Sequence, residues 1–340
     1  MRPWPYYQHW LDVVSRSFAL CIPQLDAPYR DQVGLAYLLF RVLDTVEDAP
    51  FAEQATRQRQ FERLRAFLRA MPARPVVDAF VETFPDGITE GERSLLHETY
   101  DLLDDGHTLP SLPRAAMFRA LDRMACGMAA YTRRPAPLRL LDGEDVARYC
   151  CFVAGVVGEM LTDLWALDRN VSGPSPLLAY HFGLFLQKVN ILKDQHEDEA
   201  AGRFLVPHRG ELLASLTRNA AGGLSYIQAL PRGDRYRIFC AWSLMLGAAT
   251  IAHLDEPRQS RRNESAELLS HTAAIVDDND ALARQLADLM PALPAEDHLR
   301  RVGKPESFDW FRRTLAAPLT ESELLGLGVV GPRASLHARF

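Results

Sequence analysis

The sequence has few cysteines, and none stands in a pattern that binds a metal or builds a disulfide framework. Five cysteines occur among 340 residues, an odd number at scattered positions, and no C-x-x-C pair is present. Structural zinc sites and disulfide scaffolds depend on such spacings, so we exclude both and expect reduced thiols. The ten histidines form no H-E-x-x-H motif, and no E-x-x-H pair of the kind that a di-iron bundle needs occurs.

A basic surface for nucleic acid is also missing. The chain carries 38 Lys and Arg against 44 Asp and Glu, which gives a formal net charge of −6. Proteins that bind nucleic acid in a general way present a strongly basic face, because phosphate contacts dominate their affinity. We therefore expect no nucleic-acid partner.

Long hydrophobic runs are absent as well. The longest uncharged apolar run, residues 238–252, has fifteen residues, whereas a membrane span needs about 20. The first residues lack the basic-then-apolar order of a signal peptide. We expect a cytoplasmic protein with 238–252 as a buried helix and without a transmembrane anchor.

Strand signals are weak, and helical periodicity fills most of the chain. No run of alternating β-branched residues flanks a tight Asn-Gly or Asp-Gly turn. Apolar residues instead recur at three- and four-residue steps, most clearly in 32–48, 144–167, 175–198 and 235–254. Turn-forming clusters separate these segments at 71–75, 85–87, 109–113, 133–137 and 172–175. The pattern predicts one all-α domain over 1–300 and a peripheral, partly disordered extension over 301–340.

Two acidic clusters interrupt this apolar helical sequence. Asp44, Glu47 and Asp48 end one apolar run, and a second cluster with the same i, i+3, i+4 spacing ends another run; it consists of Asp194, Glu197 and Asp198. On a helix this spacing places the three carboxylates on one face, where they repel one another. Divalent cations supply the missing charge, and oxygen ligands favour Mg²⁺ or Mn²⁺. Two other acidic runs, 101–106 and 276–280, adjoin turns and are expected to be solvated.

Basic residues accompany both clusters. Arg41 precedes the first cluster, and the second is followed by Arg203 and preceded by Lys188 and Lys193; Arg16 lies nearer the N-terminus. Mg²⁺ commonly binds to a few carboxylates together with substrate phosphates. Metal ions and guanidinium groups together stabilise a departing diphosphate, and an apolar, aromatic cavity protects a carbocation from water. Lys188 could act with the other basic residues beside the second cluster, or it could equally lie at the rim of such a cavity.

At this point the sequence resembles the squalene/phytoene synthase family, the head-to-head trans-prenyl transferases, and most closely its squalene synthase branch. The matching stretches are SRSFALCIPQL (15–25), YLLFRVLDTVED (37–48), YCCFVAGVVG (149–158), the segment 183–207 and, more weakly, FCAWSLMLGAATI (239–251). The resemblance implies a single-domain helical prenyl-synthase (class I terpenoid synthase) fold with a central cavity. It also implies that two farnesyl diphosphates are joined through presqualene diphosphate, with NADPH as the reductant where squalene is formed.

The resemblance assigns residues by position. It implies two Mg²⁺-binding pairs, Asp44 with Asp48 and Asp194 with Asp198, supported by Glu47, Glu197 and Asn190. The residues that match diphosphate contacts are Arg16, Arg41, Lys193 and Arg203. Tyr149 matches a tyrosine that handles a proton during cyclopropane formation, Tyr37 lines the same region, and Phe239 faces cationic intermediates. Gly155 and Gly158 could admit prenyl chains close to the backbone or simply permit tight helix packing.

Some positions depart from the family pattern. Phe152 stands where squalene synthases commonly have a second tyrosine, and Lys193 replaces an arginine, which removes bidentate geometry. Trp242 and Ser243 replace an expected Pro-Gln, and the basic segment for the nicotinamide cofactor is reduced to residues 258–267. The first half-reaction, which joins two farnesyl diphosphates to presqualene diphosphate, is therefore better supported than the second, in which NADPH is the reductant.

Several alternatives remain open. The same scaffold could use geranylgeranyl diphosphate and give phytoene, or it could ionise one prenyl diphosphate and close rings as a terpene cyclase. A helical protein without catalysis that binds prenyl lipids is a further alternative, which the acidic and basic residues disfavour. Because the expected product is almost insoluble in water, peripheral membrane association is consistent with each of the enzymes. The oligomeric state does not follow from the sequence.

Overall fold

The computed structural model describes residues 1–15, 17–254 and 262–290 and is helical almost throughout this part of the chain. Its described strands are β1 (Leu138–Arg139) and β2 (Arg203–Phe204), which pair in parallel. The all-α prediction is confirmed. Arg16, the extension 301–340 and residues 258–261 of the basic segment 258–267 lie outside the described residues.

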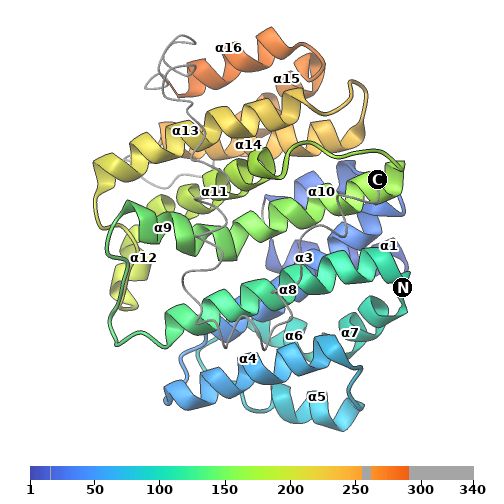
Figure 1. The fold of residues 1–340 in the computed structure, drawn as a ribbon, viewed down its shortest axis with the longest axis vertical. Helices are drawn as coiled ribbons and strands as arrows, with labels where there is room; N and C mark the ends of the chain where they lie inside the picture. The colour runs from blue at the N-terminus through green and yellow to red at the C-terminus, as the bar shows by residue number, and fades with distance from the viewer. Residues whose placement is uncertain (16, 255–261, 291–340) are drawn as a thin grey trace. The chain divides into compact units, whose positions relative to one another are not determined.

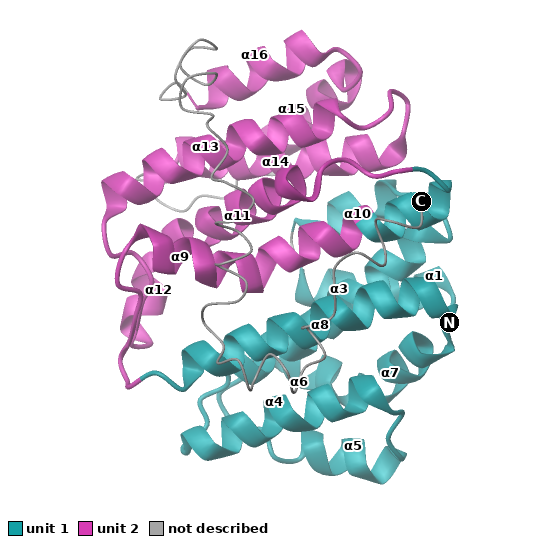
Figure 2. Ribbon diagram, viewed as in Figure 1, with its two compact units in different colours: residues 1–134, 163–171, 321–340 teal, residues 135–162, 172–320 magenta. Residues whose placement is uncertain are grey.

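The chain divides into two compact units, which Figure 2 shows in teal and magenta. The first holds α1 (Trp4–Val14), α2 (Phe18–Cys21), η1 (Ile22–Gln24), α3 (Tyr29–Asp48), α4 (Gln54–Arg69), α5 (Arg74–Val81), α6 (Glu90–His97), α7 (Thr99–Thr108) and α8 (Ser111–Thr132). The second holds β1, α9 (Gly143–Cys150), η2 (Cys151–Gly155), α11 (Pro176–Lys193), α12 (Gln195–Ala200), β2, α13 (Arg209–Gln228), α14 (Arg235–Ala252), α15 (Arg262–Ile275) and α16 (Asn279–Leu289). The division falls within α10 (Val156–Arg169). The expectation of a single domain over 1–300 stays a prediction.

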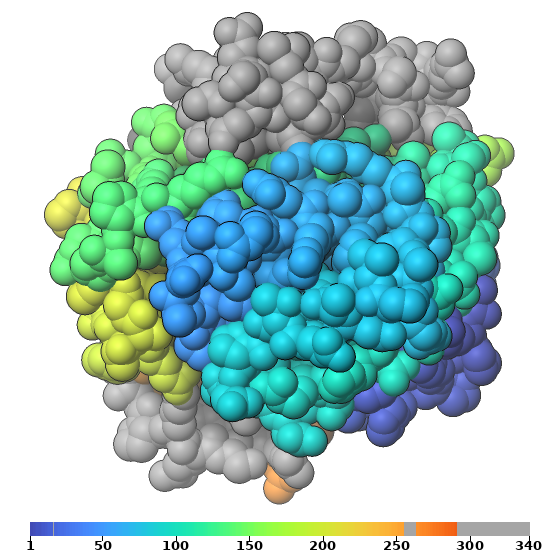
Figure 3. Space-filling model, turned by 90° about the horizontal axis from the view of Figure 1, so that it is seen from below, coloured from blue at the N-terminus to red at the C-terminus, as the bar shows by residue number. Residues whose placement is uncertain are grey.

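The first unit is built around α3. This helix packs against α1, α4, α6, α7 and α8 (Figure 1), and most of its residues are buried. α4 shows how the surrounding helices are patterned, since Phe61, Leu64 and Phe67 are buried while Arg59 and Arg63 are exposed. Figure 3 shows the surface to which α4, α5 and α6 contribute, coloured blue to cyan. Burial of the apolar face of each helix is the main source of stability in such a bundle.

In the second unit α11 packs along α13 and also contacts η2 and α14 (Figure 1). Glycines permit the close approach between α11 and the η2–α10 stretch. A Cβ on Gly158 would lie 2.4 Å from the carbonyl oxygen of Ala179, and one on Gly183 would lie 2.4 Å from that of Ala154. Of the two interpretations of Gly155 and Gly158, the structure therefore supports tight packing.

The predicted segment 144–167 forms one helical stretch, Gly143–Arg169, but it contains a π-helical turn at Cys151–Gly155. By length and composition this is the one stretch among the described residues that could cross a membrane, although 67% of its apolar window is buried inside the protein. Such burial is also typical of a core helix. The predicted breaks are confirmed: for example, α4 ends before 71–75 and α5 begins within it, at Arg74, while 172–175 lies between α10 and α11.

Candidate functional site

The first acidic cluster lies at the C-terminal end of α3. Tyr37, Arg41, Asp44 and Asp48 follow one another at steps of four, three and four residues, so they form a polar stripe along one side of the helix. Asp48 is exposed, whereas Glu47 is buried, with 8% of its surface exposed. The three carboxylates therefore differ in their access to solvent.

Arg41 connects this stripe to a second helix. Its guanidinium donates hydrogen bonds to Asp44 at 3.2 Å and to Glu92 of α6 at 3.3 Å. Glu92 also completes a capping box with Thr89, accepting from the backbone N–H of Thr89 at 2.9 Å. Glu92 was not predicted as a site residue from the sequence. The T-x-x-E pattern at 89–92 signals a helix start, but it carries no information about Arg41.

The surrounding charges keep Arg41 a cation. Burial alone would lower the pKa of Arg41, but the charges of Asp44, Tyr37, Glu92 and Asp48 raise it above the ordinary value. Burial also raises the pKa of Tyr37, although a hydrogen bond with Ser15 and the charge of Arg41 oppose this shift. Tyr37 is therefore a neutral hydroxyl beside a permanent positive charge.

The second acidic cluster lies where α11 meets α12. α11 ends at Lys193, and Asp194 (φ −100°, ψ 11°) joins the two helices, so the continuous helix expected through this cluster is wrong. The helical hydrogen bonding nevertheless continues, because the Asp198 N–H donates to the Asp194 carbonyl at 2.9 Å. Asp194 and Asp198 thus remain one turn apart. Glu197 and Asn190 are exposed.

Each aspartate of the second cluster has a cation close by. Lys193 forms an ion pair with Asp194 at 3.1 Å, and Arg203 forms one with Asp198 at 3.1 Å. β2 holds Arg203 in place, because its residues pair with β1 in parallel register. The structure therefore brings together the acidic and basic residues that the sequence predicted within this unit. Arg16, the remaining predicted diphosphate contact, lies outside the described residues.

The predicted catalytic residues Tyr149 and Phe239 lie in the second unit and are both buried. Tyr149 is near the end of α9, two residues before the π-helical turn, an irregularity that is frequent at functional sites. Phe239 of α14 stacks on Tyr236 with ring centroids 5.9 Å apart. Lys188, in contrast, does not lie at a rim: it is 1% exposed and donates to Ser215 and Asn219 of α13.

The donor set of the two clusters fits Mg²⁺. Each cluster offers two aspartates one helical turn apart, and all the donors are oxygens. Within the described part of the chain, no three His, Cys, Asp or Glu side chains come together as a protein-only metal cage would require. Mg²⁺ is usually bound by one or two carboxylates with water and substrate phosphates, so such a cage is not needed.

Comparison with known proteins finds one family model and several similar squalene synthases. The model of the squalene/phytoene synthase family matches residues 11–212. The chain is similar to squalene synthases of Mycosarcoma maydis (36% identity, 59% of this chain, 34% of the relative), Eremothecium gossypii (32%, 71%, 60%) and Rattus norvegicus (30%, 72%, 62%). It thus spans less than two thirds of the length of these relatives.

Solved structures show a similar fold. The structure of TcSQS with the ligand E5700 superposes with a TM-score of 0.70 at 22% identity and covers 95% of this chain and 97% of that one. A dehydrosqualene synthase in complex with a ligand superposes with a TM-score of 0.53 at 18% identity and covers 80% and 95%. At these identities the likeness concerns the fold, and it confirms the all-helical prenyl-synthase architecture.

Proposed function

Because the chain belongs to the squalene/phytoene synthase family, we propose that it is a prenyltransferase that condenses two prenyl diphosphates head to head. The proposed donor is farnesyl diphosphate, the intermediate is presqualene diphosphate, and the product is squalene or a related C30 compound. One observation carries the proposal: two acidic clusters, each with basic side chains bonded to it, both lie inside the matched region.

In the proposed reaction the two clusters hold Mg²⁺, for which Mn²⁺ could substitute. Asp44 and Asp48 are the ligands in the first unit with Glu47 in support, and the second unit supplies Asp194 and Asp198, with Glu197 and Asn190 in support. When bound, Mg²⁺ neutralises the diphosphate and makes it a better leaving group.

The basic residues are proposed to bind the diphosphate oxygens. Arg41 is suited to this because Asp44 and Glu92 hold its planar guanidinium in one orientation. Lys193 and Arg203 would act in the second unit, and Arg16 is assigned by position alone. Side chains that are already oriented stabilise the developing negative charge without a reorganisation cost during the reaction.

The buried aromatic residues would act on the prenyl chains. We assign the proton transfer of cyclopropane formation to Tyr149 and place Tyr37 in the same step. Phe239 would stabilise a cationic intermediate through its ring face. NADPH is proposed only for a reductive second step, and no residue is assigned to it because residues 258–261 of segment 258–267 lie outside the described residues. A cytoplasmic enzyme loosely associated with a membrane would suit these substrates and products.

Product analysis tests the proposal. The purified full chain is incubated with farnesyl diphosphate and Mg²⁺, with and without NADPH, and extracts are analysed by mass spectrometry. We expect diphosphate release and presqualene diphosphate in both reactions, with squalene only where NADPH is added. If no prenyl diphosphate yields diphosphate under either condition, the proposal is refuted.

Two further reactions separate the alternatives on the same scaffold. Competition between farnesyl and geranylgeranyl diphosphate reports the preferred donor length, and preference for the longer donor would indicate a phytoene-type synthase. A product that contains a single prenyl unit would indicate a terpene cyclase. Diphosphate release alone does not distinguish these reactions, so product mass is the decisive measurement.

A further inference from the structure

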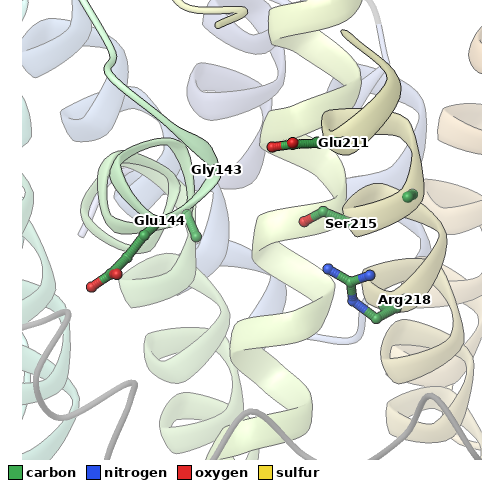
Figure 4. Close-up of a pocket in the computed structure, with 7 residues that line it drawn as sticks. Gly143, Glu144, Glu211, Ser215 and Arg218 are labelled. Carbon is green, nitrogen blue, oxygen red and sulfur yellow. The ribbon is translucent and has the colours of Figure 1, made fainter. Parts of the chain in front are cut away.

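A pocket of about 380 Å³ lies between α9 and α13 in the second unit. It is lined by Gly143, Glu144 and Ala147 of α9 and by Glu211, Ala214, Ser215 and Arg218 of α13 (Figure 4). Small-molecule sites commonly have volumes of about 300–1,000 Å³. None of the residues assigned to the prenyl transfer lines this pocket, so it calls for an explanation of its own.

Ser215 offers its hydroxyl proton to the pocket. The ammonium group of Lys188, buried on α11, donates hydrogen bonds to Ser215 Oγ and, at 2.6 Å, to Asn219 Oδ1. A lysine ammonium can only donate, so Ser215 accepts this bond and its own proton is left for another acceptor. Within the described parts of the chain Ser215 has no second hydrogen-bond partner.

Arg218 adds a cationic donor one turn further along. Figure 4 shows Glu211, Ser215 and Arg218 extending from the same side of α13. Arg218 makes neither a hydrogen bond nor an ion pair with any described residue. Burial and then the charges of Lys188 and Arg218 lower the pKa of His181 to about 4, so His181 is neutral at pH 7 and the two cations set the local charge.

The two acidic side chains of the pocket are not equivalent. Glu144 is already paired with Arg148 at 2.9 Å. Glu211 has no ion pair or hydrogen bond among the described residues and faces Gly143 across the pocket (Figure 4). The pocket thus presents two donors, Ser215 and Arg218, and one strong acceptor, Glu211.

We propose that this pocket binds a small phosphorylated molecule. Its phosphate or diphosphate group accepts hydrogen bonds from Arg218 and Ser215, and an amino or hydroxyl group of the same molecule donates to Glu211. Phosphate oxygens accept hydrogen bonds, and in this pocket the guanidinium of Arg218 and the hydroxyl of Ser215 can only donate to them. The two side chains therefore suit a phosphate group. Lys188 is a positioning residue that orients Ser215. This site requires neither a prenyl chain nor a divalent metal, so it is independent of the proposed function.

Binding of inorganic diphosphate to the full chain tests the proposal. The titration is followed by calorimetry with EDTA present, which suppresses metal-dependent binding at the acidic clusters. We expect Arg218→Gln and Ser215→Ala each to weaken binding at least about tenfold, as loss of a hydrogen bond to a charged group implies. Arg284→Gln, an exposed arginine on α16 of the same unit, is the matched control and is expected to bind as the unchanged protein does.

Glu211 gives a test of opposite sign. Glu211→Gln removes a negative charge, so it is expected to bind inorganic diphosphate more tightly. The same variant is expected to bind phosphoethanolamine more weakly, because its amino group loses the acceptor. Equal affinities of Arg218→Gln and Arg284→Gln would overturn the proposal. It would also be overturned if inorganic phosphate, diphosphate and phosphoethanolamine all failed to bind at up to about 10 mM.

Discussion

Replacing Arg237 with methionine is expected to destabilise the protein by about 3–5 kcal/mol. Arg237 lies on α14 and is 1% exposed. Its guanidinium donates to three backbone carbonyls, those of Val276 (2.7 Å), Ile227 (2.8 Å) and Leu230 (2.8 Å), and to Asn279 Oδ1. These carbonyls lie at the ends of α13 and α15, where helices leave carbonyl groups without intrahelical partners.

The magnitude follows from these bonds. The Ile227 carbonyl keeps a second donor, the Leu230 N–H at 3.1 Å, so the substitution removes the donor from two carbonyls, those of Val276 and Leu230. A buried acceptor that loses its partner costs about 1–3 kcal/mol, so these two carbonyls give roughly 2–6 kcal/mol. Part of this cost is offset, because methionine removes a buried cation and because water can reach carbonyls near the ends of helices. The Arg237–Asp277 ion pair at 3.5 Å adds little, since Asp277 is about half exposed. An intermediate value of about 3–5 kcal/mol is therefore expected.

Urea and thermal unfolding followed by circular dichroism would measure this change, and the melting temperature is expected to fall by about 5–10 °C. Arg237→Lys keeps the charge, but one ammonium cannot reach four acceptors, so an intermediate loss is expected. Arg284→Met is the matched control on an exposed helix of the same unit, with an expected change within about 0.5 kcal/mol. The reasoning is refuted if Arg237→Met unfolds at the same urea concentration as Arg284→Met.

Three further predictions concern the acidic groups and Arg41. Arg41→Lys is expected to lower kcat about 10- to 100-fold without loss of fold, because one ammonium cannot bridge Asp44 and Glu92. The rate of diphosphate release measures kcat, and an unchanged rate would contradict the role assigned to Arg41. Asp44→Asn and Asp194→Asn are each expected to lower kcat about 10²- to 10³-fold, with a raised Mg²⁺ requirement as the distinguishing readout. Asp105 has a pKa held below its usual range, because hydrogen bonds and the charge of Arg2 outweigh burial. The stability that Asp105 contributes is therefore fully present above about pH 4 and is lost as the pH falls through the lowered pKa. In the Asp105→Asn variant, the measured free energy of unfolding should depend less on pH in that range.

The helices and the stripe on α3 could be predicted from the sequence because both depend on local spacing. Steps of three and four residues place Arg41, Asp44 and Asp48 on one side of any helix that contains them, and the structure has that helix. The break at 172–175 follows from turn-forming residues, which end helices by local backbone preference.

Contacts between distant segments could not be predicted in this way. Nothing in the sequence near Arg41 indicates Glu92, fifty-one residues away. The run 101–106 was expected to be solvated, yet Asp105 is 3% exposed and accepts hydrogen bonds from Tyr7 and Arg2, so that expectation is wrong for this residue. Such a buried carboxylate is stable only where donors converge on it, and the donors come from the other end of the unit's sequence.

The packing glycines connect the fold to the second acidic cluster. α11 carries Lys193 at its end and leads directly into Asp194, so the position of the cluster depends on where α11 lies. Backbone atoms of Ala154 and Ala179 occupy the space that a Cβ on Gly183 or Gly158 would need. A backbone cannot give way as a side chain can, so these glycines fix the distance of α11 from the η2–α10 stretch. Tyr149 lies near the end of α9, two residues before η2, so the same packing sets the separation of Tyr149 from α11. It thereby sets how two predicted functional elements, Tyr149 and the second acidic cluster, are placed within one unit.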